Sequence, residues 1–265
     1  ENIYSLFEGT AGRQTVIRVS STPSVEGSRL VTVVPVASED GLRTRAWIED
    51  NRRLVDKLSG GRLAYVWLPN TAGAGYTSFT RYFYAQQDKE GAVIDERYNQ
   101  GGMVADYIVN ELDRKVMGFF SLRDGNSFTS PMAGLYGPKV MIVNESAGSG
   151  GDALPFYFKQ RKLGPIVGTR TWGGLVGTLG FPVTIDGGGI TAPNLAFFNN
   201  SGEWDVENIG VSPDIEVEND PASEIAGRDA QLDRAIEEVK KQMAKNPPAF
   251  PPQPADPVKT KAAVK

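Results

Sequence analysis

The sequence predicts an α/β fold for most of the chain, and three observations support this prediction. Apolar runs of strand length alternate with amphipathic helical segments between residues 44 and 170. Gly-rich turns follow two of these runs, at 95–102 and 144–152, where open α/β sheets place their ligand sites. The chain has 265 residues, of which 40 % are hydrophobic, enough for one large or two modest domains with a buried core.

Cysteine and histidine are both absent from the sequence. The lack of Cys excludes disulfides, Cys-ligated zinc and a thiol nucleophile. The lack of His excludes an imidazole metal ligand and a complete Ser-His-Asp triad within these residues. A catalytic site must therefore use carboxylates, hydroxyls, Lys, Tyr or backbone amides, or take its imidazole from elsewhere. We expect no metal and no cofactor.

The charge balance and the apolar pattern argue against two kinds of partner. A net charge of −4, from 28 basic and 32 acidic residues, gives no basic surface for nucleic acid. No run of 18 apolar residues occurs, so we expect no membrane span.

The absence of Cys is compatible with either the cytoplasm or the periplasm. Because the first residue is Glu1 and not Met, we expect processing or a fragment.

Residues 1–39 resemble part of a small β-rich module. A short helix is predicted at 2–8, and Gly9 is expected to end it. Strands are predicted at 15–19 and 30–36, on either side of a Pro-, Ser- and Gly-rich loop. Two strands are too few to hold a core by themselves.

Residues 40–245 form the predicted α/β domain. Its first helix, at 44–58, carries an apolar stripe and ends at Gly60. The elements expected after it are a strand at 62–68, a helix around Phe79 and Phe83, a strand at 91–96, a helix at 104–112, a strand at 139–143, a helix from 150, strands at 165–168, 181–185 and 196–198, and a helix at 229–245. The tail, 246–265, holds six of the 17 prolines, so we expect it to be extended and disordered.

The first Gly-rich turn, 95–102, ends in Gly101 and Gly102. Glycines at this place leave backbone N–H groups free to face a ligand near the start of a helix. The alternative is a tight turn that requires Gly only for its positive φ angles. The turn alone does not decide between the two.

The second turn, 144–152, presents Ser149 between Gly148 and Gly150 at the start of a helix. The positive end of the helix dipole suits a nucleophile whose substrate becomes an oxyanion. The simpler interpretation is a helix N-cap, a role that Ser fills well. The segment does not match Gly-x-Ser-x-Gly, so Ser149 as nucleophile is a hypothesis at this point.

Five blocks between Gly61 and Pro213 resemble the catalytic domain of the tricorn protease family, within the wider superfamily of C-terminal processing peptidases. They occur in the same order and spacing as in that family, and the likeness continues more loosely through 229–245. The blocks are Gly-Arg-Leu-Ala-Tyr-Val-Trp-Leu-Pro (61–69), Val-Ile-Asp-Glu-Arg-Tyr-Asn-Gln-Gly-Gly (93–102), Asn-Glu-Ser-Ala-Gly-Ser-Gly-Gly-Asp (144–152), Leu-Gly-Pro-Ile-Val-Gly-Thr-Arg-Thr-Trp-Gly-Gly-Leu-Val-Gly (163–177) and Val-Glu-Asn-Ile-Gly-Val-Ser-Pro-Asp (206–214).

The resemblance implies a role for individual residues. Ser149 matches the family nucleophile, and the amides of Gly102 and Gly150 match the two oxyanion-hole donors, with Gly101 beside them in the substrate site. Glu207 matches the carboxylate of a Ser-His-Ser-Glu tetrad. Read alone, Glu207 would be an ordinary solvated acid.

The resemblance also implies a fold and an assembly. The catalytic domain would be a crotonase/ClpP-like spiral of helices and strands, preceded by a PDZ module of which residues 1–39 are the second half. The tetrad's His and its supporting Ser would then lie before Glu1, in an upstream segment or a partner chain. The family expectation is a cytoplasmic homo-oligomer, a hexamer, that acts on peptides.

Three positions depart from the wider family. Gly174 stands where related peptidases with a Ser-Lys dyad carry the Lys, which favours the tricorn branch. Gly150 replaces a frequent Asp but keeps the amide N–H. The acidic determinant for basic substrates would fall near Gly118, where this chain has Phe119 and Phe120. We therefore expect these two rings to bind apolar side chains, since an unpaired buried cation there would be costly.

Three functions are therefore compared. The first is a serine endopeptidase core that degrades oligopeptides or unfolded chains through an acyl-enzyme at Ser149, with a His from outside these residues. The second is a non-catalytic peptide-binding or assembly module that has lost its general base. The third is crotonase-like acyl-thioester chemistry, against which the Ser149 turn and the block around Glu207 both argue.

Overall fold

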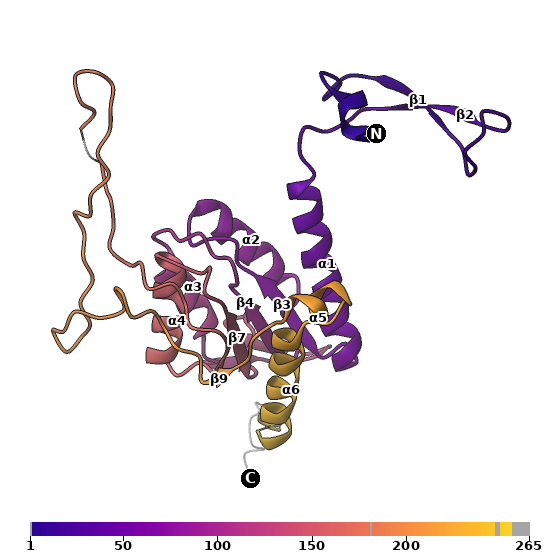
Figure 1. The fold of residues 1–265 in the computed structure, drawn as a ribbon. Helices are drawn as coiled ribbons and strands as arrows, with labels where there is room; N and C mark the ends of the chain where they lie inside the picture. The colour runs from indigo at the N-terminus through magenta and orange to yellow at the C-terminus, as the bar shows by residue number, and fades with distance from the viewer. Residues whose placement is uncertain (1, 181, 247–249, 256–265) are drawn as a thin grey trace, which may run out of the picture. The chain divides into compact units, whose positions relative to one another are not determined.

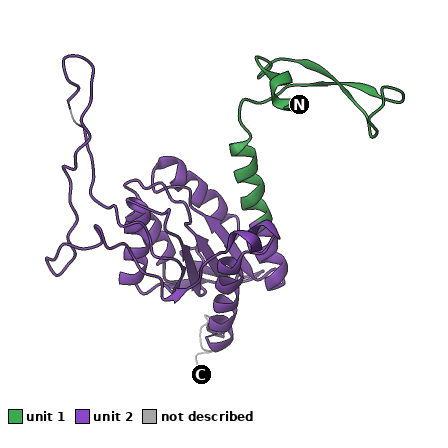
Figure 2. Ribbon diagram, in the orientation of Figure 1, with its two compact units in different colours: residues 1–50 green, residues 51–265 purple. Residues whose placement is uncertain are grey.

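The computed structural model describes residues 2–180, 182–246 and 250–255. The chain divides into two units, residues 1–50 and 51–265 (Figure 2). The first unit contains the short helix η1 (Ile3–Phe7) and the strands β1 (Thr15–Val19) and β2 (Arg29–Val33). Helix α1 (Asp40–Ser59) starts in the first unit and ends in the second.

Strands β1 and β2 form an antiparallel hairpin, in register from Thr15 opposite Val33 to Val19 opposite Arg29. No residue between 2 and 46 is buried. This agrees with the expectation that two strands and one helical turn are too little chain to enclose a core.

The second unit is built on a parallel sheet with strand order β3-β4-β7-β8-β9 (Figure 1). The strands β4 and β7 at its centre are buried along their whole length. Such continuous apolar runs are typical of a parallel sheet that is covered on both faces. The strand bounds are β3 (Leu63–Trp67), β4 (Gly91–Asp95), β7 (Lys139–Val143), β8 (Ile166–Gly168) and β9 (Ile215–Glu216).

Helices cover the sheet as the alternating sequence pattern predicts. Helix α6 packs across β4 and β7, whereas α2 packs on β3 and α3 lies against α4 (Figure 1). The main core cluster joins α2, α3 and α4 to alternate residues of the strands. The helix bounds are α2 (Gly73–Tyr84), α3 (Ala105–Leu112), α4 (Gly150–Gln160), α5 (Pro221–Ile225) and α6 (Ala230–Lys245). The prediction of an α/β fold is confirmed. None of the helices in the described ranges is both long and apolar enough to cross a bilayer.

Two parts of the sequence prediction fail. The strand predicted at 181–185 is not formed at 182–185, and Phe181 lies outside the described residues. The strand predicted at 196–198 is reduced to one isolated bridge, between Phe198 and Trp204. Most of this stretch is exposed and has no neighbouring strand to pair with, so its local alternation does not lead to a sheet.

A short antiparallel hairpin, β5 (Gly118–Phe120) and β6 (Phe128–Ser130), was not predicted. The described part of the tail lies against it: the ring of Phe250 is 5.5 Å from that of Phe119, and Gln253 accepts a hydrogen bond from Ser127. Residues 250–255 contain no helix or strand. The disorder predicted for the tail otherwise concerns 247–249 and 256–265, outside the described residues.

Candidate active site

The two Gly-rich turns come together because the strands before them are neighbours. Strands β4 and β7 pair in parallel, with Asp95 opposite Ile142, so their carboxyl ends share one edge of the sheet. Two hydrogen bonds join the turns directly. The Tyr98 amide donates to Asn144 Oδ1 over 2.9 Å, and the Gly148 amide donates to the Asn99 carbonyl over 3.1 Å.

Ser149 stands at the junction between its turn and helix α4. Its backbone has φ 58° and ψ −117°, a conformation that L-residues rarely adopt. Such a backbone costs about 1–3 kcal/mol and persists only where the surroundings hold it. A Ser held in this way is more than a simple helix cap, because an ordinary N-cap residue has extended backbone.

The glycines of the first turn lie against Ser149 and Gly150. A Cβ on Gly101 would be 2.7 Å from the Cβ of Ser149. A Cβ on Gly150 would be 2.3 Å from the carbonyl oxygen of Gly102 and 2.8 Å from its nitrogen. In the described part of the chain, neither the Gly102 amide nor the Gly150 amide has a hydrogen-bond acceptor. The structure thus brings together four residues that the sequence analysis selected.

The Ser149 side chain borders a cavity of about 380 Å³, together with Gly102 and Gly150. The other lining residues are mainly apolar, and Asp106 is the one charged residue among them. These lining residues are Met103, Ala105, Asp106, Ala153, Tyr157, Leu175, Val176, Gly177, Thr178, Leu179, Leu195, Ala196 and Phe197. A cavity of this kind suits an apolar group of a ligand.

Phe119 and Phe120 are not part of this cavity. They belong to the β5–β6 hairpin, and Phe119 lines a different cavity of about 620 Å³ that also includes Lys139. Lys139 starts strand β7, whereas Ser149 follows the end of that strand. The structure therefore does not bring the two rings to Ser149, and the apolar walls beside Ser149 come from other segments.

Glu207 reaches the loop that forms one wall of the cavity. Its Oε2 accepts hydrogen bonds from the amides of Leu175 (2.6 Å) and Val176 (2.8 Å). The residues on either side of it, Val206 and Asn208, have φ angles of 71° and 60°. A positive φ is a clear outlier for a β-branched residue such as Val206. Strain of this kind often marks a functional position.

Asp152 holds both the same loop and the turn that carries Ser149. It is fully buried and accepts the amide of Ser149 over 2.8 Å. Its other donors are Thr171 Oγ1 at 2.6 Å, the Gly173 amide at 2.7 Å and the Gly174 amide at 3.0 Å. The sequence analysis gave Asp152 no role. A Ser followed three residues later by an acid before an apolar run is a capping-box pattern, and that signal was available.

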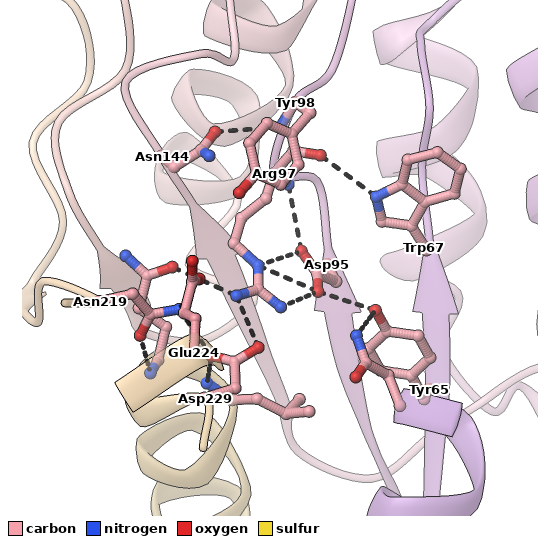
Figure 3. A network of polar contacts seen from close by, with 12 residues as sticks. Tyr65, Trp67, Asp95, Arg97, Tyr98, Asn144, Asn219, Glu224 and Asp229 are labelled. Carbon is pink, nitrogen blue, oxygen red and sulfur yellow. Dashed lines mark hydrogen bonds and ion pairs between the residues drawn. The ribbon is translucent and has the colours of Figure 1, made fainter. Parts of the chain in front are cut away.

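A buried ion-pair network supports the first turn from below (Figure 3). Arg97, whose side chain is 2 % exposed, donates to Asp95 Oδ2 over 2.6 Å and to Asp229 Oδ2 over 2.8 Å. Burial opposes the charge, but the carboxylate of Asp95 still raises the pKa of Arg97. The Arg97 carbonyl accepts the indole N–H of Trp67 over 3.1 Å. The side chain and the backbone carbonyl of Arg97 are therefore both held, which fixes the backbone that leads to Gly101 and Gly102.

Glu96 is a further buried acid near the site, beside Asp95 and Asp152. Burial raises the pKa of its carboxyl well above the ordinary value, and the neighbouring Asp152 and Asp95 carboxylates raise it further. Its Oε1 atom has no hydrogen-bond partner among the described residues. Burial and the two neighbouring carboxylates therefore both favour the protonated form of Glu96.

Comparison with known proteins agrees with this geometry. The family described as Peptidase family S41 matches residues 62–217. The chain is 39 % identical to Tricorn protease homolog 1 of Streptomyces coelicolor over 251 residues, which covers 93 % of this chain and 23 % of that protein. It is 36 % identical to the tricorn protease of Thermoplasma acidophilum over 237 residues, covering 89 % of this chain and 22 % of that protein.

A crystal structure of the tricorn protease superposes with a TM-score of 0.83 at 35 % identity, over 91 % of this chain and 24 % of that one. The chain thus spans about a quarter of the length of the relatives that it matches. Together with the family match over the residues that carry the two turns and Glu207, these likenesses establish that the chain belongs to peptidase family S41 and is a homologue of the tricorn proteases.

Proposed function

We propose that this chain carries the nucleophile, oxyanion hole and supporting carboxylate of a serine-type peptidase. The observation that supports this most strongly is the convergence of Ser149 with the free amides of Gly102 and Gly150 at one cavity. Two amides beside a hydroxyl are what an acyl-transfer site needs to stabilise a developing oxyanion. Losing one such donor typically costs about 2.7–4 kcal/mol of transition-state stabilisation.

In the proposed reaction, Ser149 Oγ attacks the scissile carbonyl carbon while its proton passes to an imidazole. The carbonyl oxygen becomes an oxyanion that accepts hydrogen bonds from the amides of Gly102 and Gly150. The leaving amine then takes the proton, and an acyl ester remains on Ser149 until water hydrolyses it. No lysine lines this cavity in the described part of the chain, so a Lys base has no support.

The imidazole must come from outside these residues, because the sequence contains no His. We propose that an upstream segment or a partner chain supplies it and that Glu207 supports its orientation. The likeness to tricorn proteases favours the first arrangement, with residues 1–39 as the second half of a PDZ module and 40–245 as a crotonase/ClpP-like catalytic domain. By the same likeness, the proposal includes a cytoplasmic homo-oligomer, a hexamer, that acts on oligopeptides or unfolded chains.

The second candidate is a peptide-binding or assembly module without activity. The absence of His supports it, since the residues present do not complete a proton-transfer system. The apolar cavity would then bind a peptide side chain and perform no chemistry.

A fluorophosphonate probe distinguishes these candidates. We would label the chain alone and the chain with its natural flanking sequence, with Ser149→Ala as the control. The peptidase proposal predicts adduct formation at Ser149 only where a His is supplied, together with peptide hydrolysis. Glu207→Gln should slow labelling. The Gln side chain still accepts hydrogen bonds from the backbone amides, but it carries no charge to support the imidazole. Peptide binding with no labelling in any form would favour the second candidate.

A further inference from the structure

Four consecutive backbone amides beside the cavity are held by two carboxylates. Asp152 accepts from Gly173 and Gly174, and Glu207 accepts from Leu175 and Val176. We call residues 173–176 the amide strap. Its two anchors come from distant parts of the chain, one in the first turn of α4 and the other in the loop before β9.

The anchor at Asp152 uses both carboxylate oxygens. Oδ1 accepts from Thr171 Oγ1 and the Gly173 amide, while Oδ2 accepts from the amides of Gly174 and Ser149. A carboxylate has about four acceptor positions, so the side chain is fully satisfied. No cation forms an ion pair with it among the residues that the structure describes. Four donors and the positive end of α4 replace the counter-ion.

Asn at this position would not provide the same contacts. Its single oxygen would accept from two donors at most, and its NH₂ group would face the N–H groups that remain. Because the site is buried, the unpaired donors could not turn to water. The hydrogen bonds lost would be those from the Ser149 amide or from the amides of the strap.

We propose that Asp152 is a positioning residue, which fixes the left-handed backbone of Ser149 and couples it through the amide strap to Glu207. The inference rests on the proposed function, because it assigns Asp152 a task in that reaction. Ser149, the nucleophile, and Glu207, the carboxylate that supports the imported imidazole, are thereby held in fixed positions relative to each other. The strap's Leu175 and Val176 also line the cavity.

Positioning makes a specific kinetic prediction. Asp152→Asn is expected to lower kcat about 100-fold, the loss typical of a displacement of about 1 Å at the reacting atoms. KM for a peptide should change little, because most of the apolar side chains that line the cavity, such as Met103, Tyr157 and Phe197, lie outside the strap. In addition, kcat losses in Asp152→Asn and Glu207→Gln should be non-additive, since both act on one strap.

The control is Asp214→Asn. Asp214 also accepts a backbone amide, that of Ile166 over 2.8 Å, and pairs with Lys159. It lies away from the cavity, so kcat and KM should both stay close to wild type.

The experiment uses the chain with its natural flanking sequence and measures kcat, KM and hydrogen exchange over 171–177. Faster exchange of this segment in Asp152→Asn, with kcat lowered and KM preserved, supports the inference. Equal kcat losses in Asp152→Asn and Asp214→Asn, or unchanged exchange in Asp152→Asn, would overturn it. If wild type hydrolyses no peptide and takes no probe, the proposed function fails. In that case, exchange over 171–177 still decides whether Asp152 holds the strap.

Discussion

Gly101 and Ser149 are packed so closely that a Cβ on Gly101 would lie 3.0 Å from the Ser149 Oγ atom. Gly101 also has a φ angle of 79°, which an L-residue adopts only with strain. The position of Ser149 therefore depends on the absence of a side chain at Gly101 in the neighbouring turn.

Replacement of Gly101 by Ala is expected to displace Ser149 and to abolish fluorophosphonate labelling. It should also lower the midpoint of urea unfolding. Gly118→Ala is the matched control, because a Cβ there would meet nothing within 4 Å. Normal labelling of Gly101→Ala would show that the contact does not fix the nucleophile.

Replacement of Ser149 by Gly is expected to remove activity and to stabilise the fold. Gly relieves the strain of the positive φ angle, and after the entropy that Gly adds to the unfolded chain the gain should be about 1 kcal/mol. Equilibrium urea unfolding measures it. Ser146→Gly is the control, because Ser146 is an exposed residue of the same turn and its own φ angle is not positive; this variant should not gain stability. No gain in Ser149→Gly would contradict the assignment of strain.

Replacement of Glu96 by Gln should change how stability depends on pH. The pKa of this carboxyl is raised in the folded state by burial and by Asp152 and Asp95. Between the unfolded and folded pKa values the folded state binds the extra proton. Rising pH therefore removes stability there at about 1.4 kcal/mol per pH unit. The loss ends at the folded pKa.

Glu96→Gln has no carboxyl to ionise, so its stability relative to wild type should increase as the pH rises above the ordinary pKa of a Glu carboxyl. The measurement is urea unfolding at several pH values. Glu90→Gln is the control: the hydrogen bond and charge of Arg62 lower the pKa of Glu90, so this variant should show no such increase. A constant difference between wild type and Glu96→Gln across the range would be the contrary result.

Replacement of Arg97 by Met should destabilise the protein by about 3–5 kcal/mol, because it leaves the buried carboxylate of Asp95 without its cation, with the Tyr65 hydroxyl still donating to it. The exposed pair of Arg62 with Glu90 provides the comparison, and Arg62→Met should have a far smaller effect. Chemical denaturation measures both. Equal losses would show that the buried network does not support the first turn.

The regular part of the fold could be predicted because its signals are local. Strand 139–143 and helix α6 were placed from an apolar run and an amphipathic stripe, which need no knowledge of neighbours. The hairpin of Gly118–Phe120 and Phe128–Ser130 was missed because strands of three residues carry no measurable period. The region 182–198 alternated but found no partner strand, and pairing is a property of the whole sheet.

The candidate site was predictable to the extent that it follows strands. Both Gly-rich turns were found in the sequence, but their contact depends on β4 and β7 being neighbours, which is a matter of topology. The contacts of Asp152 with Gly173 and of Glu207 with Leu175 join segments far apart in the chain, and no periodicity encodes them. Phe119 was expected near the substrate from the family resemblance, whereas the structure places it on the β5–β6 hairpin and in another cavity.

The amide strap also bears on how this protein can change during evolution. Its anchors bind main-chain N–H groups, which every residue except Pro provides. The side chains of Leu175 and Val176 line the cavity yet take no part in these bonds. Mutation can therefore reshape this wall of the cavity, while the backbone geometry around Ser149 is inherited unchanged.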